Sequence, residues 1–195
     1  MLSSESDHVV SQPCAFEGDL AAKVKELEKK VEDRTNRQLR KTMIFRNIKE
    51  TEEEKTWEDT TDIVAGKISS LLDIDLEDAE YMIDRCHRGG DPKFYKRKNR
   101  IRPIYIAFLR WPDCEQIIKA ARGQNEFHVD YKFGPLTTAR RNEALKLRKE
   151  MKKDGKLTKA FVRFPAVLMG KKVGSSKYEI IRDFSDDEVV PKKEE

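Results

Sequence analysis

The chain has 195 residues, which is enough for one ordinary domain or two small ones. Its hydrophobic content of 37% is low and its charged content of 39% is high, a composition typical of a modest core with long solvated segments. No apolar run reaches membrane-spanning length and no signal pattern opens the chain, so we expect an intracellular protein without a membrane partner. The three widely spaced cysteines form no disulfide framework and no C-x-x-C clip, which predicts a reducing compartment.

The net charge of +4 hides an uneven distribution of charge along the chain. Residues 50–62 hold seven acids and one Lys, and the end after Asp183 is acidic again. Residues 119–159 hold twelve Lys or Arg against five acids. A local positive field attracts a polyanion, so this segregation favours a nucleic-acid partner.

The N-terminal part predicts a tail followed by a helix. Residues 1–18 are Ser-rich and without period, and we expect them to be disordered. Residues 19–40 predict a coiled-coil helix with an a/d seam of Leu20, Val24, Leu27 and Val31, spaced by 4, 3 and 4. A short helix with so narrow a stripe is marginal alone, which favours self-association, and a lone solvated helix is the alternative.

Residues 41–134 predict a βαββαβ domain of the ferredoxin-like kind that RNA-recognition domains use, within an overall α+β fold. RNA-recognition domains normally present stacking aromatics on the open face of the sheet. Here Ile44 stands at one such position, and the alternation of the third strand leaves only Tyr105 with a ring on that face. We therefore do not expect bases to be read by stacking on this sheet.

Residues 135–184 predict a smaller C-terminal α+β domain, with a long basic helix followed by short strands. Its aromatic residues fit either the core or base stacking. Phe164 is the best candidate for an exposed ring, because alternation puts it on the face opposite Phe161. Residues 185–195 predict an acidic disordered tail.

The stretch from Arg85 to Arg102 holds eight Lys or Arg and a single Asp. Gly89, Gly90 and Pro92 predict a loop that is neither helix nor strand, with mobile cations suited to phosphate contact. A loop kept soluble by its charge is the alternative. Together with the later cations it suggests a groove that follows a nucleic-acid backbone. The predicted contact residues are Arg85, Arg88, Lys96, Arg97, Lys98, Arg100, Arg102, Tyr105, Arg122, Arg140, Arg141, Arg148 and Phe164.

The sequence offers little for catalysis. The three histidines are far apart, and none has metal-ligand or triad spacing with a Cys or Ser. The acidic run 50–62 fits a solvated loop, or an internal competitor for the basic groove, better than a metal site. We predict no enzyme, no metal, no cofactor and no small-molecule substrate.

Several segments together resemble one family. They are "VEDRTNRQLRKTMIFRNIKE", "DRCHRGGDPKFYKRKNRIRPIYIAF", "IIKAARG", "TTARRNEALKLRKEMKKDGK" and "RFPA". In this order, from Leu20 to Phe184, the chain resembles the protein of the first open reading frame of LINE-type retrotransposons. The resemblance implies a trimerising coiled coil, an RNA-recognition domain, and a C-terminal domain that closes on it around single-stranded nucleic acid.

The resemblance also points to individual residues. It implies nucleic-acid contacts by Arg85 or Arg88, the cations from Lys96 to Arg102, Arg122, Arg140 with Arg141, and Phe164 before Pro-Ala. "KVKELE" resembles the family's trimerisation motif with Lys in place of Arg, although the family's coiled coil is far longer. Asn47 stands where the family tends to have Gly.

The expected function is sequence-tolerant binding of single-stranded RNA or DNA by a nucleic-acid chaperone. The resemblance implies that it packages retrotransposon RNA into cytoplasmic ribonucleoprotein particles, with nuclear entry left open. Two alternatives remain. One is a non-catalytic protein-interaction adaptor that works through the coiled coil, and the other is an RNA regulator recruited by the host.

Overall fold

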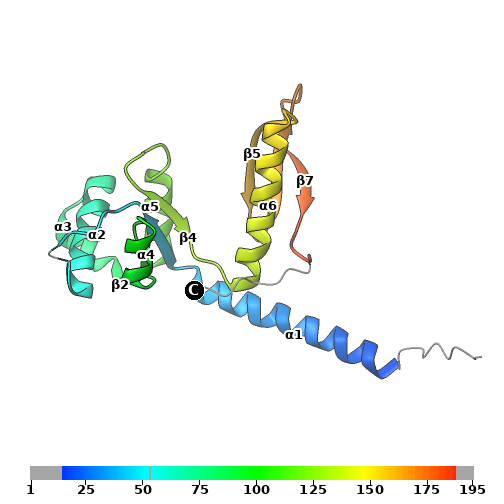
Figure 1. Cartoon of the computed structure of the whole chain (residues 1–195), viewed down its shortest axis with the longest axis horizontal. Helices are drawn as coiled ribbons and strands as arrows, with labels where there is room; N and C mark the ends of the chain where they lie inside the picture. Colours follow the sequence, from blue (N-terminus) through cyan, green and yellow to red (C-terminus); the bar gives the residue numbers. More distant parts are fainter. Residues whose placement is uncertain (1–14, 53, 188–195) are drawn as a thin grey trace, which may run out of the picture.

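The computed structural model describes residues 15–52 and 54–187 (Figure 1). The predicted mixture of helices and strands is confirmed, with an N-terminal helix and antiparallel sheets. The helices are α1 (Ala15–Leu39), α2 (Trp57–Leu72), α3 (Leu76–Tyr81), α4 (Pro92–Arg97), α5 (Trp111–Ala120) and α6 (Pro135–Lys153). The strands are β1 (Thr42–Arg46), β2 (Ile83–Arg88), β3 (Ile104–Phe108), β4 (His128–Tyr131), β5 (Leu157–Arg163), β6 (Val167–Lys172) and β7 (Glu179–Asp183).

The predicted disordered ends are only partly within the described residues. Residues 1–14 and 188–195 lie outside them, so that part of the prediction is left open. Residues 15–18, predicted as tail, belong to α1. The helix therefore begins earlier than its heptad pattern indicates.

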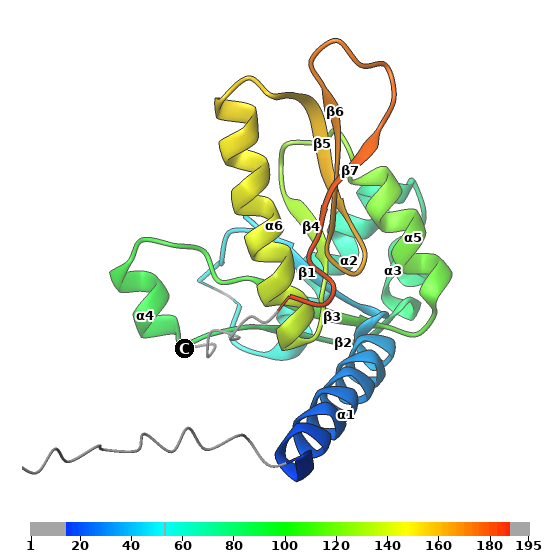
Figure 2. The ribbon, with the colours of Figure 1, turned by 90° about the vertical axis from the view of Figure 1, so that its right-hand side faces the viewer.

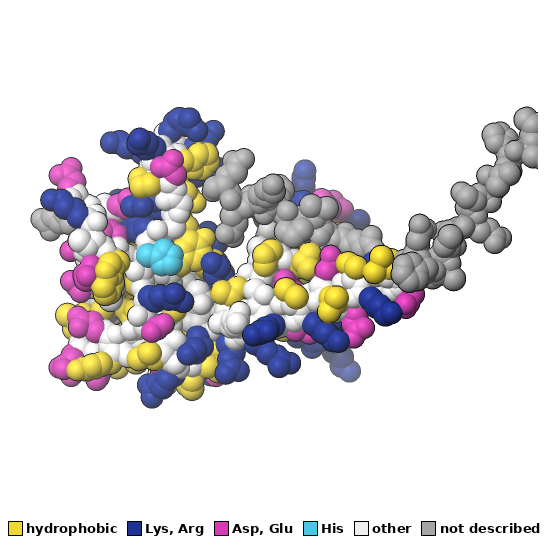
Figure 3. Space-filling view, turned by 90° about the horizontal axis from the view of Figure 1, so that it is seen from below, with side chains coloured by type: hydrophobic (Ala, Val, Ile, Leu, Met, Phe, Trp, Pro, Cys, Tyr) yellow, Lys and Arg dark blue, Asp and Glu magenta, His cyan; other side chains and the backbone are white. Residues whose placement is uncertain are grey.

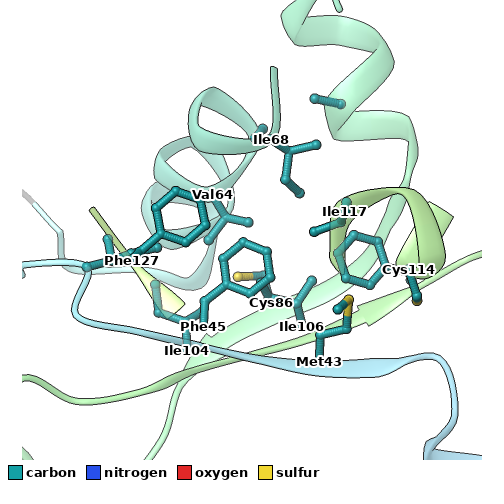
Figure 4. Packing of buried hydrophobic residues seen from close by; sticks show 14 residues of the cluster. Met43, Phe45, Val64, Ile68, Cys86, Ile104, Ile106, Cys114, Ile117 and Phe127 are labelled. Atoms are coloured by element: carbon teal, nitrogen blue, oxygen red, sulfur yellow. The ribbon is translucent and has the colours of Figure 1, made fainter. Parts of the chain in front are cut away.

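The first sheet has the strand order β2-β3-β1-β4, and every neighbouring pair is antiparallel. One face is covered by α2 and α5, and the side chains between them form the larger core (Figure 4). Phe45 of β1 lies opposite Ile104 of β3, and both are fully buried. Burial of each such side chain stabilises the fold by about 1.5–3 kcal/mol, so this core sets the position of the sheet.

The other face of the first sheet points away from α2 and α5. Alternation places Ile44, Tyr105 and His87 on it, because Tyr105 lies opposite both Ile44 and His87 in the ladder. Arg85 lies on the same face two residues before His87. We call this surface the open face.

The second sheet has the order β5-β6-β7, and α6 lies across one of its faces (Figure 1). Its core is small and consists of Ala144, Ala166, Leu168 and Phe184. Phe184, which fitted core or base stacking from the sequence, is therefore a core residue. With so few buried side chains, this part of the chain has a thin hydrophobic core.

Two short helices were not predicted. α3 precedes β2, which begins at Ile83. α4 forms inside the segment that we predicted to be neither helix nor strand, and that prediction is wrong. Pro92 occupies the first turn of α4, where its missing N–H costs nothing, and the Asp91 carboxylate accepts a hydrogen bond of 2.8 Å from Lys93 N–H.

α1 contacts the rest of the molecule near its C-terminal end. The Glu32 carboxylate accepts a hydrogen bond from the backbone N–H of Thr137 at 2.7 Å, and Asn36 Oδ1 accepts one from Gly134 N–H at 2.8 Å. α6 has no side-chain cap from its own N-cap residue, Gly134, so α1 supplies these acceptors instead. Within the described ranges, no helix is long and apolar enough to cross a membrane.

Candidate nucleic-acid interface

Four aromatic rings form a continuous row between the start of α5 and the turn after β5. Trp111 stacks on Tyr131 with a centroid distance of 5.2 Å, and Tyr131 lies 6.4 Å from Phe133. Phe133 in turn stacks on Phe164 at 5.8 Å. We call Trp111, Tyr131, Phe133 and Phe164 the ring ladder. It follows β4, an edge strand of the first sheet, and ends on the second sheet.

Arg141 of α6 holds the middle of the ring ladder. Its guanidinium carbon lies 4.5 Å from the Phe133 centroid, a cation–π distance. The same group donates hydrogen bonds of 3.3 Å to the carbonyls of Pro165 and Val162. Burial lowers the pKa of Arg141, and the nearby charge of Asp130 partly offsets this. The guanidinium still remains charged near neutral pH.

Two further predicted residues belong to the same neighbourhood. The Phe164 ring is 54% exposed, so one end of the ladder is open to a stacking base. Arg122 is exposed after α5 and lies close enough to Tyr131 to act on it. Burial raises the pKa of the Tyr131 hydroxyl, and the charge of Arg122 opposes that rise. The structure thus brings Arg141 and Phe164 to the same ring, Phe133, while Arg122 lies within electrostatic reach of Tyr131.

The open face carries a second, smaller cluster of aromatic and basic side chains. Tyr105 stacks on His87 at 5.7 Å, and Lys132 Nζ lies 4.5 Å above the Tyr105 ring. The Arg85 side chain is 78% exposed beside them. Burial, followed by the charges of Lys132 and Arg85, lowers the pKa of His87, which keeps that imidazole neutral near neutral pH. Gly89 lies flat against Tyr105, since a Cβ there would stand 2.1 Å from a ring carbon.

Two predicted phosphate contacts have internal partners instead. The side chain of Arg88 is 3% exposed and forms a bidentate ion pair with Glu54, at 2.7 and 2.9 Å. It also donates to the carbonyls of Ile48 and Lys49. We correct the prediction for Arg88, because a buried guanidinium with these partners has no surface for a phosphate.

Arg102 is held in a similar way by the acidic loop. Its guanidinium donates hydrogen bonds to both oxygens of Glu50, and its side chain is 19% exposed. Glu50 and Glu54 belong to the acidic run that precedes α2. Two acids of that run therefore pair with two of the predicted cations. We correct the prediction for Arg102, which anchors the acidic loop instead of binding phosphate.

The cations of α4 and the residues after it lie elsewhere. Lys96, Arg97, Lys98 and Arg100 are exposed, and Arg97 lies 5.9 Å from the Phe94 ring. α4 follows β2, at the edge of the sheet opposite β4, and Figure 2 shows α4 and α5 on opposite sides of the molecule. The expectation that all predicted cations share one trough is therefore wrong. Only some of them surround the ring ladder.

Arg140 and Arg148, the other predicted phosphate contacts on α6, are partly engaged or buried within the protein. Arg140 Nε donates to the carbonyl of Asp187 at 3.0 Å. Arg148 follows Arg141 by two helical turns and so lies on the same side of α6. Its Nε is buried with no hydrogen-bond partner among the described residues.

The predicted oligomerisation seam is exposed along α1. Leu20, Val24, Leu27 and Val31 are 46–64% exposed, and Figure 3 shows hydrophobic side chains in a row along this helix. Val24, Leu27 and Val31 also line a groove with Leu136 of α6. Exposed apolar stripes of this kind mark contact surfaces.

Searches among protein-family models and curated proteins found no match. The likeness to the retrotransposon family therefore depends on the sequence segments quoted above. Within residues 15–52 and 54–187, no three His, Cys, Asp or Glu side chains gather as metal ligands would.

Three members of the site had no sequence signal of their own. Trp111, Tyr131 and Phe133 looked like ordinary strand and helix residues. The spacing of Tyr131 and Phe133, two residues apart at the end of a predicted strand, was the only available hint that they share a side.

Proposed function

We propose that this protein binds single-stranded nucleic acid without sequence preference and without catalysis. The observation that carries the proposal is the ring ladder, with Arg141 on Phe133 and the exposed ring of Phe164 at its end. Stacking on such rings is tolerant of sequence, because every base has a π-face. Cations beside the rings are suited to the phosphates between the bases.

The cations beside the ring ladder and those on the open face have different roles. Arg122 binds the backbone beside the ring ladder and Arg141 holds Phe133 in place there, while Arg85 and Lys132 extend the positive surface over the open face. The exposed cations of α4 attract the strand from a distance, since they lie on the far edge of the sheet. Many weak contacts of this kind screen strand repulsion yet exchange quickly, which is what a nucleic-acid chaperone requires.

We assign residues 41–134 to the RNA-recognition type of βαββαβ domain. The antiparallel order β2-β3-β1-β4 supports this assignment. Its usual base-stacking surface is reduced to Tyr105, with Ile44 opposite it. In our proposal the ring ladder at the β4 edge takes over the stacking that the open face lacks.

The family resemblance supplies a biological role for the binding activity. We propose that the protein coats retrotransposon RNA in a ribonucleoprotein particle and that α1 drives its self-association, as a trimer in the family pattern. The exposed apolar seam of α1 supports a helical partner. An active element and a host-recruited RNA regulator would share this biochemistry.

The same seam favours a second candidate, a protein-interaction adaptor that pairs α1 with a longer coiled coil elsewhere. Purification from an extract with and without nuclease separates the two. A nucleic-acid binder loses its excess absorbance at 260 nm after nuclease treatment, whereas an adaptor keeps its protein partners.

The proposal is tested by titrating a labelled single strand against the protein at two salt concentrations. If about five phosphates are neutralised, affinity falls roughly 100-fold between 50 and 200 mM salt. Phe164→Ala should weaken binding by about tenfold, because one stacked base is lost. Tyr81→Ala removes a comparably exposed ring, 69% exposed at the end of α3, and should leave affinity unchanged. A flat salt response, or equal effects of the two variants, refutes the proposal.

A further inference from the structure

The second sheet has a face that points away from α6. Ala160 and Val162 of β5 pack toward the core under α6, so Lys159, Phe161 and Arg163 point the other way. Lys171 of β6 pairs with Lys159 and lies on the same side. We call Lys159, Phe161, Arg163, Lys171 and Tyr178 the outer face.

Two aromatic rings are exposed on the outer face. Phe161 and Tyr178 meet edge to face with centroids 5.3 Å apart, and their residues are 43% and 44% exposed. Lys171 Nζ lies 4.8 Å from the Tyr178 centroid. The rings are thus held in place by each other and by a cation, with much of their surface left to solvent.

The outer face is also electropositive. None of Lys159, Arg163 and Lys171 forms an ion pair with another described residue. One acid, Asp183, stands at its end: hydrogen bonds from Ser185 lower the pKa of that carboxyl, and the charge of Arg163 adds to the effect. Three cations against one acid favour an anionic partner.

The outer face and the ring ladder meet at the end of β5. Arg163 immediately precedes Phe164, the last ring of the ladder, but alternation puts Arg163 and Phe161 on the face opposite Phe164. A strand bound at Phe164 therefore has to pass round the end of β5 to reach Arg163, and the Phe161–Tyr178 pair lies beyond it.

We propose that the outer face binds further nucleotides of the same single strand that the ring ladder holds. This inference rests on the proposed function and deepens it, because it extends the binding track onto the second sheet. Exposed rings flanked by unpaired cations suit planar bases joined by phosphates. A protein partner would have to place acidic side chains opposite these three cations, whereas a nucleic-acid strand supplies phosphates along its whole length.

The proposal predicts an effect that depends on oligonucleotide length. A strand of about 6 nucleotides fills the ring ladder alone, whereas one of about 16 nucleotides also covers the outer face, within the site sizes known for such grooves. The double variant Phe161→Ala/Tyr178→Ala should bind the short strand like the wild type. It should bind the long strand about tenfold more weakly or worse, since stacking is lost.

Two controls keep the outcomes separate. Phe164→Ala should weaken both lengths, and if it weakens neither, the proposed function itself fails. If Phe164→Ala weakens both lengths while the Phe161→Ala/Tyr178→Ala variant binds both like the wild type, only the outer face is refuted. Leu76→Ala, which truncates a residue 50% exposed on α3, should change neither.

A variant that removes two charges and keeps both rings tests the proposal even if loss of the two rings unfolds the second sheet. Lys159→Gln/Lys171→Gln keeps both rings and should lower the logarithmic salt slope by about 1.4 for the long strand alone, as two phosphate contacts are lost. An unchanged slope for the long strand overturns the inference. So does a variant that loses self-association in light scattering but keeps full affinity, because the outer face would then be a protein contact.

Discussion

The carboxylate of Glu32 in α1 accepts a hydrogen bond of 2.7 Å from the backbone N–H of Thr137 in α6, 105 residues further along the chain. Glu32 is 7% exposed, although almost all of α1 faces solvent. Gly134 allows this approach, since a Cβ there would lie 2.5 Å from a Glu32 oxygen. Helix α1 thus caps the helix that carries Arg141.

Replacement of Glu32 should loosen the second sheet and α6. Glu32→Ala leaves the N-terminal N–H groups of α6 without this acceptor, so we expect the unfolding free energy to fall by about 1–2 kcal/mol. Denaturant unfolding measures the loss, and hydrogen exchange at Thr137 localises it. Asp33→Ala, one residue away and exposed, is the matched control. Equal effects of the two variants would show that the contact does not support α6.

Arg88 should matter for stability rather than for binding. Arg88→Ala leaves the carboxylate of Glu54 buried without its partner, which costs about 3–5 kcal/mol. Arg85→Ala removes an exposed cation three positions before it in β2 and should leave the unfolding midpoint nearly unchanged. Thermal unfolding compares them. A stable Arg88→Ala protein with reduced nucleic-acid affinity would return Arg88 to the binding site.

The helices and strands could be predicted from the sequence more fully than the contacts between distant residues. Hydrophobic patterning located β1, α2 and β3, because each of these has a buried stripe or an alternating face of its own. The pattern gave no sign that Arg88 meets Glu54, because the two are 34 residues apart and the ion pair depends on how two loops fold together. The ring ladder was missed for the same reason, as its rings come from α5, β4 and the turn after β5.

The helix α4 was missed for a local reason. Gly89 and Gly90 were weighed as signals for the whole segment, although Asp91 and Pro92 form a helix start in the next two positions. Composition alone could show that cations cluster there. It could not show that Arg102 faces Glu50 while Lys96 to Arg100 stay exposed.

The ion pair of Glu54 in the acidic loop with Arg88 predicts that stability depends on pH. Burial raises the pKa of Glu54, but hydrogen bonds from Arg88 and Thr60 outweigh it, so the carboxyl titrates below its ordinary value of 4.5. A lowered folded-state pKa stabilises the protein above the unfolded value, and this stability is lost as the pH falls through the folded pKa. Between about pH 6 and about pH 3 the wild type should therefore lose more unfolding free energy than Glu54→Gln. Parallel pH curves would contradict this.

Cys86 and Cys114 should be unreactive in the native protein. Burial raises the pKa of each thiol to about 12, so almost no thiolate forms near neutral pH. Cys14 lies outside the described residues, and a Cys14→Ser background isolates the other two. In iodoacetamide at about pH 8 the folded variant should resist alkylation and the denatured variant should react at both sites. Rapid labelling of folded Cys86 would show that the larger core opens.

Photo-crosslinking of a 5-iodouridine single strand, mapped by mass spectrometry, tests the central claim most directly. The account predicts crosslinks at Phe164 and Phe133 of the ring ladder, which disappear with the salt that releases the strand. Crosslinks confined to α1 or to the helical side of the first sheet around α3, with none at Phe164 or Phe133, would contradict it.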